Sequence, residues 1–169
     1  TIQAFDALWV RRSVDTSSWL ISDNGRAFRG GTTSTQYVFT GHTPASPDYD
    51  VPAQYTVVSN QITERIGVTG RSSTQDRTFY LFRLYSINGG QSNWELWKAV
   101  NGTFTPLGNP VPVTLTNGNV YNIALSMSGS TIRGMVNGSA VVTVTDSSIT
   151  QVGLPGLYFT GDTGTSNST

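Results

Sequence analysis

Two Asn-Gly dipeptides constrain the fold of this chain more than any other feature of its sequence. Asn101-Gly102 and Asn137-Gly138 each stand between two runs of β-forming residues. A two-residue hairpin turn requires a positive φ at both central residues, and Asn followed by Gly tolerates that conformation well. The sequence therefore predicts two β-hairpins. Their strands are expected at Trp94–Val100, Thr103–Leu107, Ile132–Val136 and Ser139–Val144.

Apolar alternation extends the β prediction to the rest of the chain. In the run 121–127, Tyr, Ile, Leu and Met alternate with Asn, Ala and Ser, which is typical of a strand with one buried face. No stretch longer than about ten residues has the apolar spacing of a helix. Neither a linker nor a shift in composition divides the chain. We therefore expect residues 1–169 to form a single all-β domain built as a sandwich or barrel.

The composition excludes several classes of function. Charged residues make up 12% of the chain, and 10 Lys and Arg residues balance 10 Asp and Glu residues. A chain without net charge gains no long-range attraction to nucleic acid or to an anionic membrane. No apolar run approaches the ~20 residues of a membrane-spanning helix. Cysteine is absent, which excludes disulfide bonds and cysteine-ligated zinc.

A series of short motifs between residues 48 and 160 carries a family resemblance. In order, they are Asp48-Tyr49-Asp50-Val51, Tyr55-Thr56-Val57, Ile66-Gly67-Val68, Tyr80–Leu84, Trp94–Lys98, Asn101-Gly102, Tyr121–Leu125, Gly129-Ser130, Val136-Asn137-Gly138, Val144-Thr145-Asp146 and Gly156-Leu157. In this order the chain resembles the concanavalin A-like lectin/glucanase superfamily, in particular the laminin-G-like jelly rolls of bacterial and phage exterior proteins. The resemblance implies a two-sheet antiparallel jelly-roll sandwich with one concave sheet and no single obligatory activity.

The two ends of the chain depart from the resemblance. Domains of this superfamily usually finish with a strand that pairs near the N-terminal strand, whereas residues 161–169 form a polar tail or linker. Residues 1–8 look like the missing strand. The residues expected to carry the pairing of this strand are Ile2, Ala4, Phe5 and Leu8. Two interpretations stay open: the segment belongs to its own sheet, or it closes the sheet of a neighbouring copy, because an unpaired edge accepts another strand.

A catalytic site is not expected. Glucanases of this superfamily carry two glutamates and an aspartate closely spaced on one strand, and a retaining pair of carboxyl groups must lie about 5 Å apart. This chain has two glutamates, Glu64 and Glu95, and Glu95 has Trp97 and Ala99 where acidic neighbours would stand. His42 lies near a proline in a region that we expect to be a surface loop. The sequence therefore predicts a chain that is not an enzyme.

No cofactor is expected, and the sequence shows no cluster of metal ligands. Laminin-G-like domains often hold a calcium ion through Asp and backbone carbonyl oxygens. The resemblance therefore allows a structural calcium ion at Asp6, Asp146 or Asp162. Asp146, which precedes two serines, is more simply the cap of a short turn. Asp48 and Asp50 are expected in a loop or at the start of a strand, without a role in catalysis.

Carbohydrate binding is the activity that the resemblance favours. Sugars stack on exposed aromatic rings, and a few polar groups fix their hydroxyls. Alternation places Trp94 and Trp97 on opposite faces of one strand, and places Arg83 and Tyr85 together on one face of another. The candidate sugar contacts are Arg71, Arg83, Tyr85, Trp94 and Trp97, each weighed against a role in core packing. Asn167, in the tail sequon Asn167-Ser168-Thr169, is a candidate glycosylation site.

These observations predict a non-catalytic extracellular β-sandwich module, carbohydrate-binding or adhesive, in a surface, secreted or phage-exterior protein. An alternative is a structural subunit of an extracellular filament or tandem array, assembled by exchange of the N-terminal strand. A glycoside hydrolase is the third and weakest hypothesis. The expected partners are a glycan or neighbouring copies of the chain itself. The expected location is extracellular, on a cell surface or on a virion exterior.

Overall fold

The computed structural model describes residues 3–4, 9–13, 19–21, 27–29, 36–40, 43–57, 60, 63–73 and 75–161, and it describes side chains from residue 43 onward. Within these residues the regular structure consists of β-strands, and the strand pairs are antiparallel. No helix in this part of the chain is long and apolar enough to cross a membrane. The predicted all-β class is confirmed.

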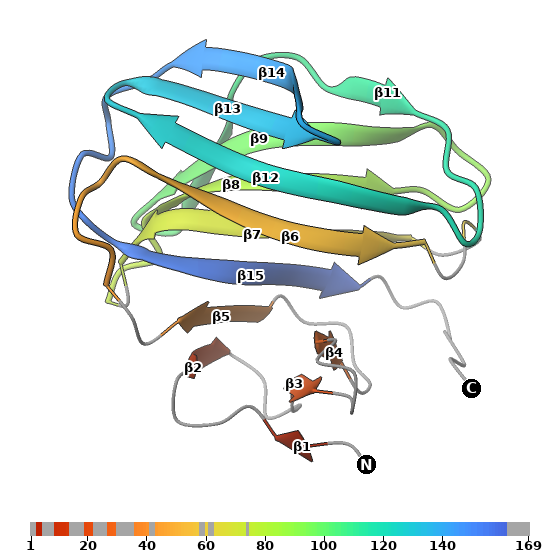
Figure 1. Cartoon of the computed structure of the whole chain (residues 1–169), viewed down its shortest axis with the longest axis horizontal. Helices are drawn as coiled ribbons and strands as arrows, with labels where there is room; N and C mark the ends of the chain where they lie inside the picture. Colours follow the sequence, from red (N-terminus) through yellow and green to blue (C-terminus); the bar gives the residue numbers. More distant parts are fainter. Residues whose placement is uncertain are drawn as a thin grey trace.

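Two main sheets form the layers of a sandwich (Figure 1). The larger sheet has the strand order β10-β9-β8-β7-β15-β5-β2, and β11 also pairs with β9. Its strands are β2 (Trp9–Ser13), β5 (Gln36–Thr40), β7 (Glu64–Ser72), β8 (Phe79–Ser86), β9 (Ser92–Val100), β10 (Thr103–Pro106), β11 (Val111–Val113) and β15 (Leu154–Gly161). The four-stranded sheet has the order β14-β13-β12-β6. Its strands are β6 (Tyr49–Thr56), β12 (Val120–Ser128), β13 (Thr131–Val136) and β14 (Ser139–Thr145).

Both Asn-Gly turns form as the sequence predicts. Asn101 and Gly102 have φ values of 50° and 80°, and Asn137 and Gly138 have φ values of 50° and 81°. The first turn joins β9 to β10 and the second joins β13 to β14, both antiparallel pairs. A positive φ at both turn residues matches the twist of the strands on either side, so the turns fix the two pairings.

The main hydrophobic core lies between the two sheets. Tyr80, Phe82 and Leu84 of β8 face it, together with Ile123 and Leu125 of β12. A second cluster, Phe79, Leu81, Ala99 and Tyr158, packs on the other face of β8. The register opposes Gly134 of β13 to Leu125, and a Cβ atom at Gly134 would stand 2.3 Å from the ring of Phe82.

Gln3 and Ala4, the described residues of the N-terminal segment, pair with a strand of their own chain. The short strands β1 (Gln3–Ala4), β3 (Trp19–Ile21) and β4 (Ala27–Arg29) form a separate three-stranded sheet, in which Ala4 opposes Leu20. The edge of the larger sheet is instead β2. Ile2, Phe5 and Leu8 lie outside the described residues, and strand exchange with a neighbouring copy stays a prediction.

The C-terminal strand corrects the predicted boundary of the tail. Gly161 is the last residue of β15, which lies between β7 and β5 inside the larger sheet. Residues 162–169, with Asp162 and the sequon residue Asn167, lie outside the described residues.

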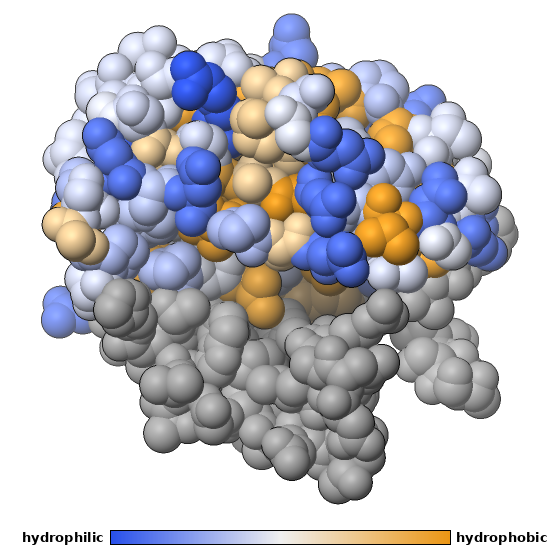
Figure 2. All heavy atoms as spheres, viewed as in Figure 1, coloured by the Kyte–Doolittle hydropathy of each residue, from blue (hydrophilic) through white to orange (hydrophobic). Residues whose placement is uncertain are grey.

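The outward side of the four-stranded sheet is the face turned to the viewer in Figure 2. Apolar atoms form a band there between hydrophilic ones (Figure 2). The register aligns Pro52, Ala124, Met135 and Ala140 in one row across the four strands. The outward register positions of these strands, all within the described part of the chain, carry no aromatic residue.

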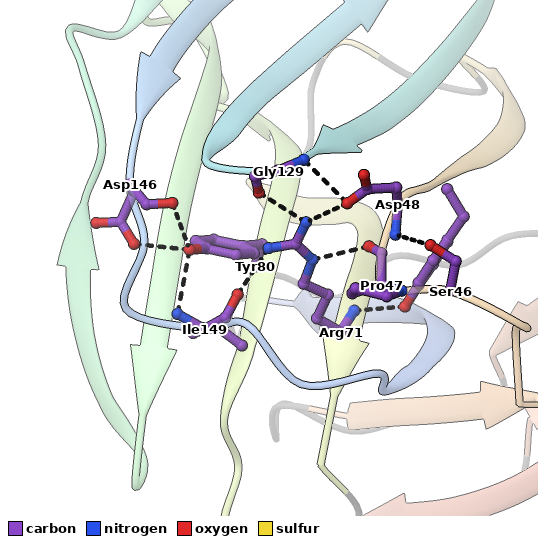
Figure 3. Close-up of polar contacts among 9 residues, drawn as sticks. Ser46, Pro47, Asp48, Arg71, Tyr80, Gly129, Asp146 and Ile149 are labelled. Atoms are coloured by element: carbon purple, nitrogen blue, oxygen red, sulfur yellow. Dashed lines mark hydrogen bonds and ion pairs between the residues drawn. The ribbon is translucent and has the colours of Figure 1, made fainter.

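Arg71, near the end of β7, connects three loops (Figure 3). Its guanidinium donates from Nε to the carbonyl oxygen of Pro47 at 2.8 Å, from Nη1 to that of Ile149 at 2.7 Å, and from Nη2 to that of Gly129 at 2.8 Å. Nη2 also pairs with Asp48 Oδ1 at 3.2 Å. Arg71 is 1% exposed, and its φ of 49° lies in the left-handed region that favours glycine.

Asp146 organises a second polar cluster beside the first. Its Oδ1 accepts hydrogen bonds from the Tyr80 hydroxyl at 2.7 Å and from the Ser148 backbone N–H at 3.0 Å, and its Oδ2 pairs with Lys98 Nζ at 2.5 Å. Partial burial alone would raise the pKa of Asp146, but the bonds from Lys98, Ser148 and Tyr80 outweigh it and hold that pKa well below its usual range. The backbone bond expected of a capping Asp146 is present, but the short turn of helix that it was predicted to cap does not form.

Replacing Arg71 by Met should lower the free energy of unfolding by about 3 kcal/mol or more. The buried carbonyl of Ile149 left without a donor costs about 1–3 kcal/mol, and the part-buried carbonyls of Pro47 and Gly129 add to the loss. Chemical denaturation measures the loss. Arg71→Lys should recover little of it, because one ammonium group cannot reach carbonyls from three segments. Arg133→Met is the control, since Arg133 forms no hydrogen bond or ion pair in the described part of the chain. Equal losses in Arg71→Met and Arg133→Met would contradict the role of Arg71.

Replacing Asp146 by Asn should change how stability depends on pH. A carboxyl whose pKa is lowered on folding stabilises the fold above its ordinary pKa of about 3.9, and this contribution disappears as the pH falls through the folded pKa. The difference in free energy of unfolding between wild type and Asp146→Asn should thus be constant from about pH 5 to 7 and shrink below about pH 4. Denaturation at a series of pH values measures it. Asp50→Asn, at an exposed carboxylate, should leave the wild-type profile unchanged. A pH-independent difference for Asp146→Asn would contradict the prediction.

Candidate functional site

The face of the larger sheet that points away from the four-stranded sheet is called the outer face here. Register and alternation place on it Arg65, Gly67 and Thr69 of β7, Phe79, Leu81, Arg83 and Tyr85 of β8, Asn93, Glu95, Trp97 and Ala99 of β9, and Gly156, Tyr158 and Thr160 of β15. Three of the five predicted sugar contacts, Arg83, Tyr85 and Trp97, therefore lie on one face. The prediction that Trp94 and Trp97 lie on opposite faces of their strand is confirmed.

Trp94 and Arg71 lie elsewhere, which corrects their predicted role. Trp94 is 3% exposed in the core between the sheets, stacked on Phe82 with ring centroids 5.7 Å apart and edge-on to Tyr121 at 5.4 Å. Alternation along β9 turns Trp94 inward when Trp97 turns outward. The guanidinium of Arg71 is buried and bonded to loop carbonyls, so it is not available to a sugar.

An ion pair occupies the centre of the outer face. Glu95 Oε2 accepts from Arg83 Nε at 2.9 Å and Nη2 at 2.8 Å, and from the indole Nε1 of Trp97 at 2.8 Å. Arg83 Nη1 also donates to the hydroxyl of Tyr158 at 3.3 Å. The side chains of Arg83 and Glu95 are 9% and 11% exposed, so the pair is largely shielded from water. The second carboxylate oxygen, Oε1, accepts no hydrogen bond from the described residues.

Glycine makes this arrangement sterically feasible. Gly67 lies between Tyr158 and Arg83 in the register of β15, β7 and β8. A Cβ atom at Gly67 would stand 2.2 Å from the carbonyl oxygen of Phe82 and 2.7 Å from Cβ of Arg83. The absence of a side chain there lets the backbones of β7 and β8 approach closely beneath the Arg83 side chain.

The next row of the outer face holds polar groups that the protein leaves unsatisfied. Arg65, Tyr85 and Asn93 are consecutive partners across β7, β8 and β9, and all three side chains are half-buried. Among the described residues, none accepts a hydrogen bond from the Arg65 guanidinium, none bonds the Tyr85 hydroxyl, and none donates to Asn93 Oδ1. We call these three residues the open row. Its members retain hydrogen-bonding capacity that a bound molecule can use.

Sequence reasoning found one member of the open row and missed the other two. Tyr85 was expected as a sugar contact on the face of its strand that also carries Arg83. Arg65 and Asn93 were not among the candidate sugar contacts. The signal that could have found Asn93 is the sequence Asn88-Gly89-Gly90, which is typical of a turn. A short turn there brings Asn93 opposite Tyr85, as the register shows.

The two glutamates lie on opposite faces of the larger sheet. Glu95 lies on the outer face, whereas Glu64 Oε1 accepts from the hydroxyl of Tyr55, a core residue, at 2.7 Å. Burial raises the pKa of Glu64, and the bond from Tyr55 opposes that shift only in part. Two carboxyl groups separated by a sheet cannot act on one glycosidic bond.

The candidate calcium ligands are only partly described. No group of three or more His, Cys, Asp or Glu residues that could hold a metal ion occurs in the part of the chain that the structure describes. Asp146 is engaged by Tyr80, Lys98 and Ser148. Asp6, Asp162 and the loop residue His42 lie outside the described residues.

Comparisons with known proteins establish the fold. No protein-family model matches the chain, and no curated protein matches it in sequence. Among solved structures, the carbohydrate binding module CBM66 from Bacillus subtilis is similar with a TM-score of 0.71 at 13% identity, over 92% of this chain and 92% of that one.

Two further structures are LamAcat from Zobellia galactanivorans, with a TM-score of 0.58 at 12% identity over 96% of this chain and 85% of that one, and the Bacillus licheniformis beta-glucanase, with a TM-score of 0.58 at 10% identity over 98% and 86%. Identities this low show the fold alone. The chain therefore has the concanavalin A-like jelly-roll fold that its sequence predicts.

Proposed function

We propose that this chain is a non-catalytic carbohydrate-binding module of an extracellular protein, and that the outer face is its binding surface. The observation that carries the proposal is the open row, in which Arg65, Tyr85 and Asn93 keep unused hydrogen-bonding groups beside one another. Partly buried polar groups without partners cost free energy, and a ligand that satisfies them recovers it. Sugars, with many hydroxyls on a compact ring, are suited to such a surface.

The aromatic residues of the outer face support the same proposal. Tyr85 and Trp97 are half-buried. Trp97 lies on the same strand as Glu95, and Tyr85 lies on the neighbouring strand β8. Oε1 of Glu95 is a further acceptor that the described residues leave unused. A ring face combined with a few fixed polar groups is the usual composition of a sugar site. The outward side of the four-stranded sheet has no aromatic residue at its described register positions, so it lacks this combination.

The neighbouring structures support a glycan ligand in a general way. One is named a carbohydrate binding module, and another a beta-glucanase. The positions of the two glutamates favour binding over hydrolysis for this chain, because Glu64 faces the core and Glu95 is held by Arg83 and Trp97. The weakly charged composition is in keeping with export, and the absence of cysteine does not argue against it.

Replacing Tyr85 by Ala should weaken glycan binding about tenfold or more, because it removes both a ring contact and a hydroxyl. A glycan array with the wild-type domain selects the ligand, and titration calorimetry compares the affinities. Arg133→Ala, on the outward side of the other sheet, is the control and should bind as wild type. A wild-type domain that binds no glycan would contradict the proposal. Equal affinities of wild type and Tyr85→Ala would contradict it as well.

The selected glycan should remain uncleaved after prolonged incubation with the domain. New reducing ends are the quantity to measure. Their appearance with wild type and loss with Glu95→Gln would show that Glu95 acts in catalysis, and would replace the binding-module proposal by a hydrolase.

A further inference from the structure

The charges on the described part of the outer face do not balance. Its described residues include two cations, Arg65 and Arg83, and one anion, Glu95. Glu95 is committed to Arg83 through two short contacts and to Trp97 through a third. The positive charge of Arg65 therefore has no counter-charge among the described residues of this face.

Arg65 is held in place although it has no ion-pair partner. Its guanidinium carbon lies 4.0 Å from the centroid of the Tyr85 ring, a cation–π contact that orients the plane of the group. The donors of the guanidinium stay unused by the described residues. A cation that is already oriented loses less conformational entropy on binding an anion than a flexible surface arginine does.

The contrast with the two buried arginines shows what Arg65 lacks. Arg71 has three carbonyl oxygens and one carboxylate as acceptors, and Arg83 has the carboxylate of Glu95 and the hydroxyl of Tyr158. Among the described residues, Arg65 has only the ring of Tyr85 as a partner. A planar guanidinium matches a carboxylate by two parallel hydrogen bonds.

We propose that the outer face recognises an acidic glycan, with the carboxylate of a uronic acid bound by the guanidinium of Arg65. This inference rests on the proposed carbohydrate-binding function and names the class of sugar. The Tyr85 hydroxyl and Asn93 Oδ1, which follow Arg65 along the open row, bind the hydroxyls of the same or the next ring. Glu95 stands one row away, and its charge is offset by Arg83, so it does not repel the ligand strongly.

The test compares ligands that differ only in charge. Polygalacturonate and alginate are each titrated into the wild-type domain beside their methyl esters, which keep the backbone and remove the carboxylate. Wild type should bind at least one of the acids about tenfold or more tighter than its ester, since hydrogen bonds to charged groups are among the strongest. The preference should shrink with added salt, because the site is only half-buried.

Matched variants assign the preference to Arg65. Arg65→Gln should bind acid and ester alike, and Arg65→Lys should keep part of the preference, because a charge remains without the planar fork. Arg133→Gln should behave as wild type. Circular dichroism and thermal unfolding of each variant show that it is folded. An acid preference retained in full by folded Arg65→Gln would overturn the assignment.

The outcomes separate this inference from the proposed function. Binding of neutral glycans or methyl esters as tight as that of the acids leaves a carbohydrate-binding module and overturns the acidic ligand. If the domain binds dextran sulfate more tightly than dextran and binds neither uronic acid polymer, the ligand is a sulfate ester. That result overturns the proposal that Arg65 binds a carboxylate. If the domain binds no glycan at all, that result contradicts the proposed carbohydrate-binding function itself.

Discussion

The guanidinium group of Arg71 is the contact on which the rest of this sandwich depends. It binds carbonyl oxygens of Pro47, Gly129 and Ile149, which stand before β6, between β12 and β13, and between β14 and β15. One side chain thereby fixes loops from both sheets at one end of the molecule (Figure 3). In a chain without cysteine, this buried cation links distant segments as a covalent bridge does elsewhere. The contacts also outweigh the cost of a left-handed backbone at Arg71.

Much of the fold could be predicted because it follows from local sequence patterns. The Asn-Gly turns fixed two hairpins, and period-two alternation assigned the faces of β8, β9 and β12. The position of β15 between β7 and β5 could not be predicted in the same way. Pairing between strands far apart in the chain depends on which edges remain open after the hairpins form, and no short motif records it.

The candidate site was predicted only in part, for two physical reasons. Alternation separated Trp94 from Trp97 but did not say which face is buried, because that depends on the opposing sheet. Arg71 resembled any other arginine in the sequence, since its partners are main-chain carbonyls. Arg65 was missed because its distinguishing property is an absence of acceptors, which only the assembled register of β7, β8 and β9 reveals.

The insertion of β15 has a consequence for the order in which the molecule is completed. Thr69 of β7 opposes Gly156, although most of the chain's hairpin contacts join near neighbours. Closing so long a loop costs chain entropy before the contacts form, which slows folding in topologies of this kind. During synthesis, the hairpins of β8, β9 and β10 can form early, but Tyr158 reaches Arg83 only when the last strand has emerged. The outer face is thus finished last, and a chain cut before residue 154 would lack the strand that carries Tyr158 onto that face.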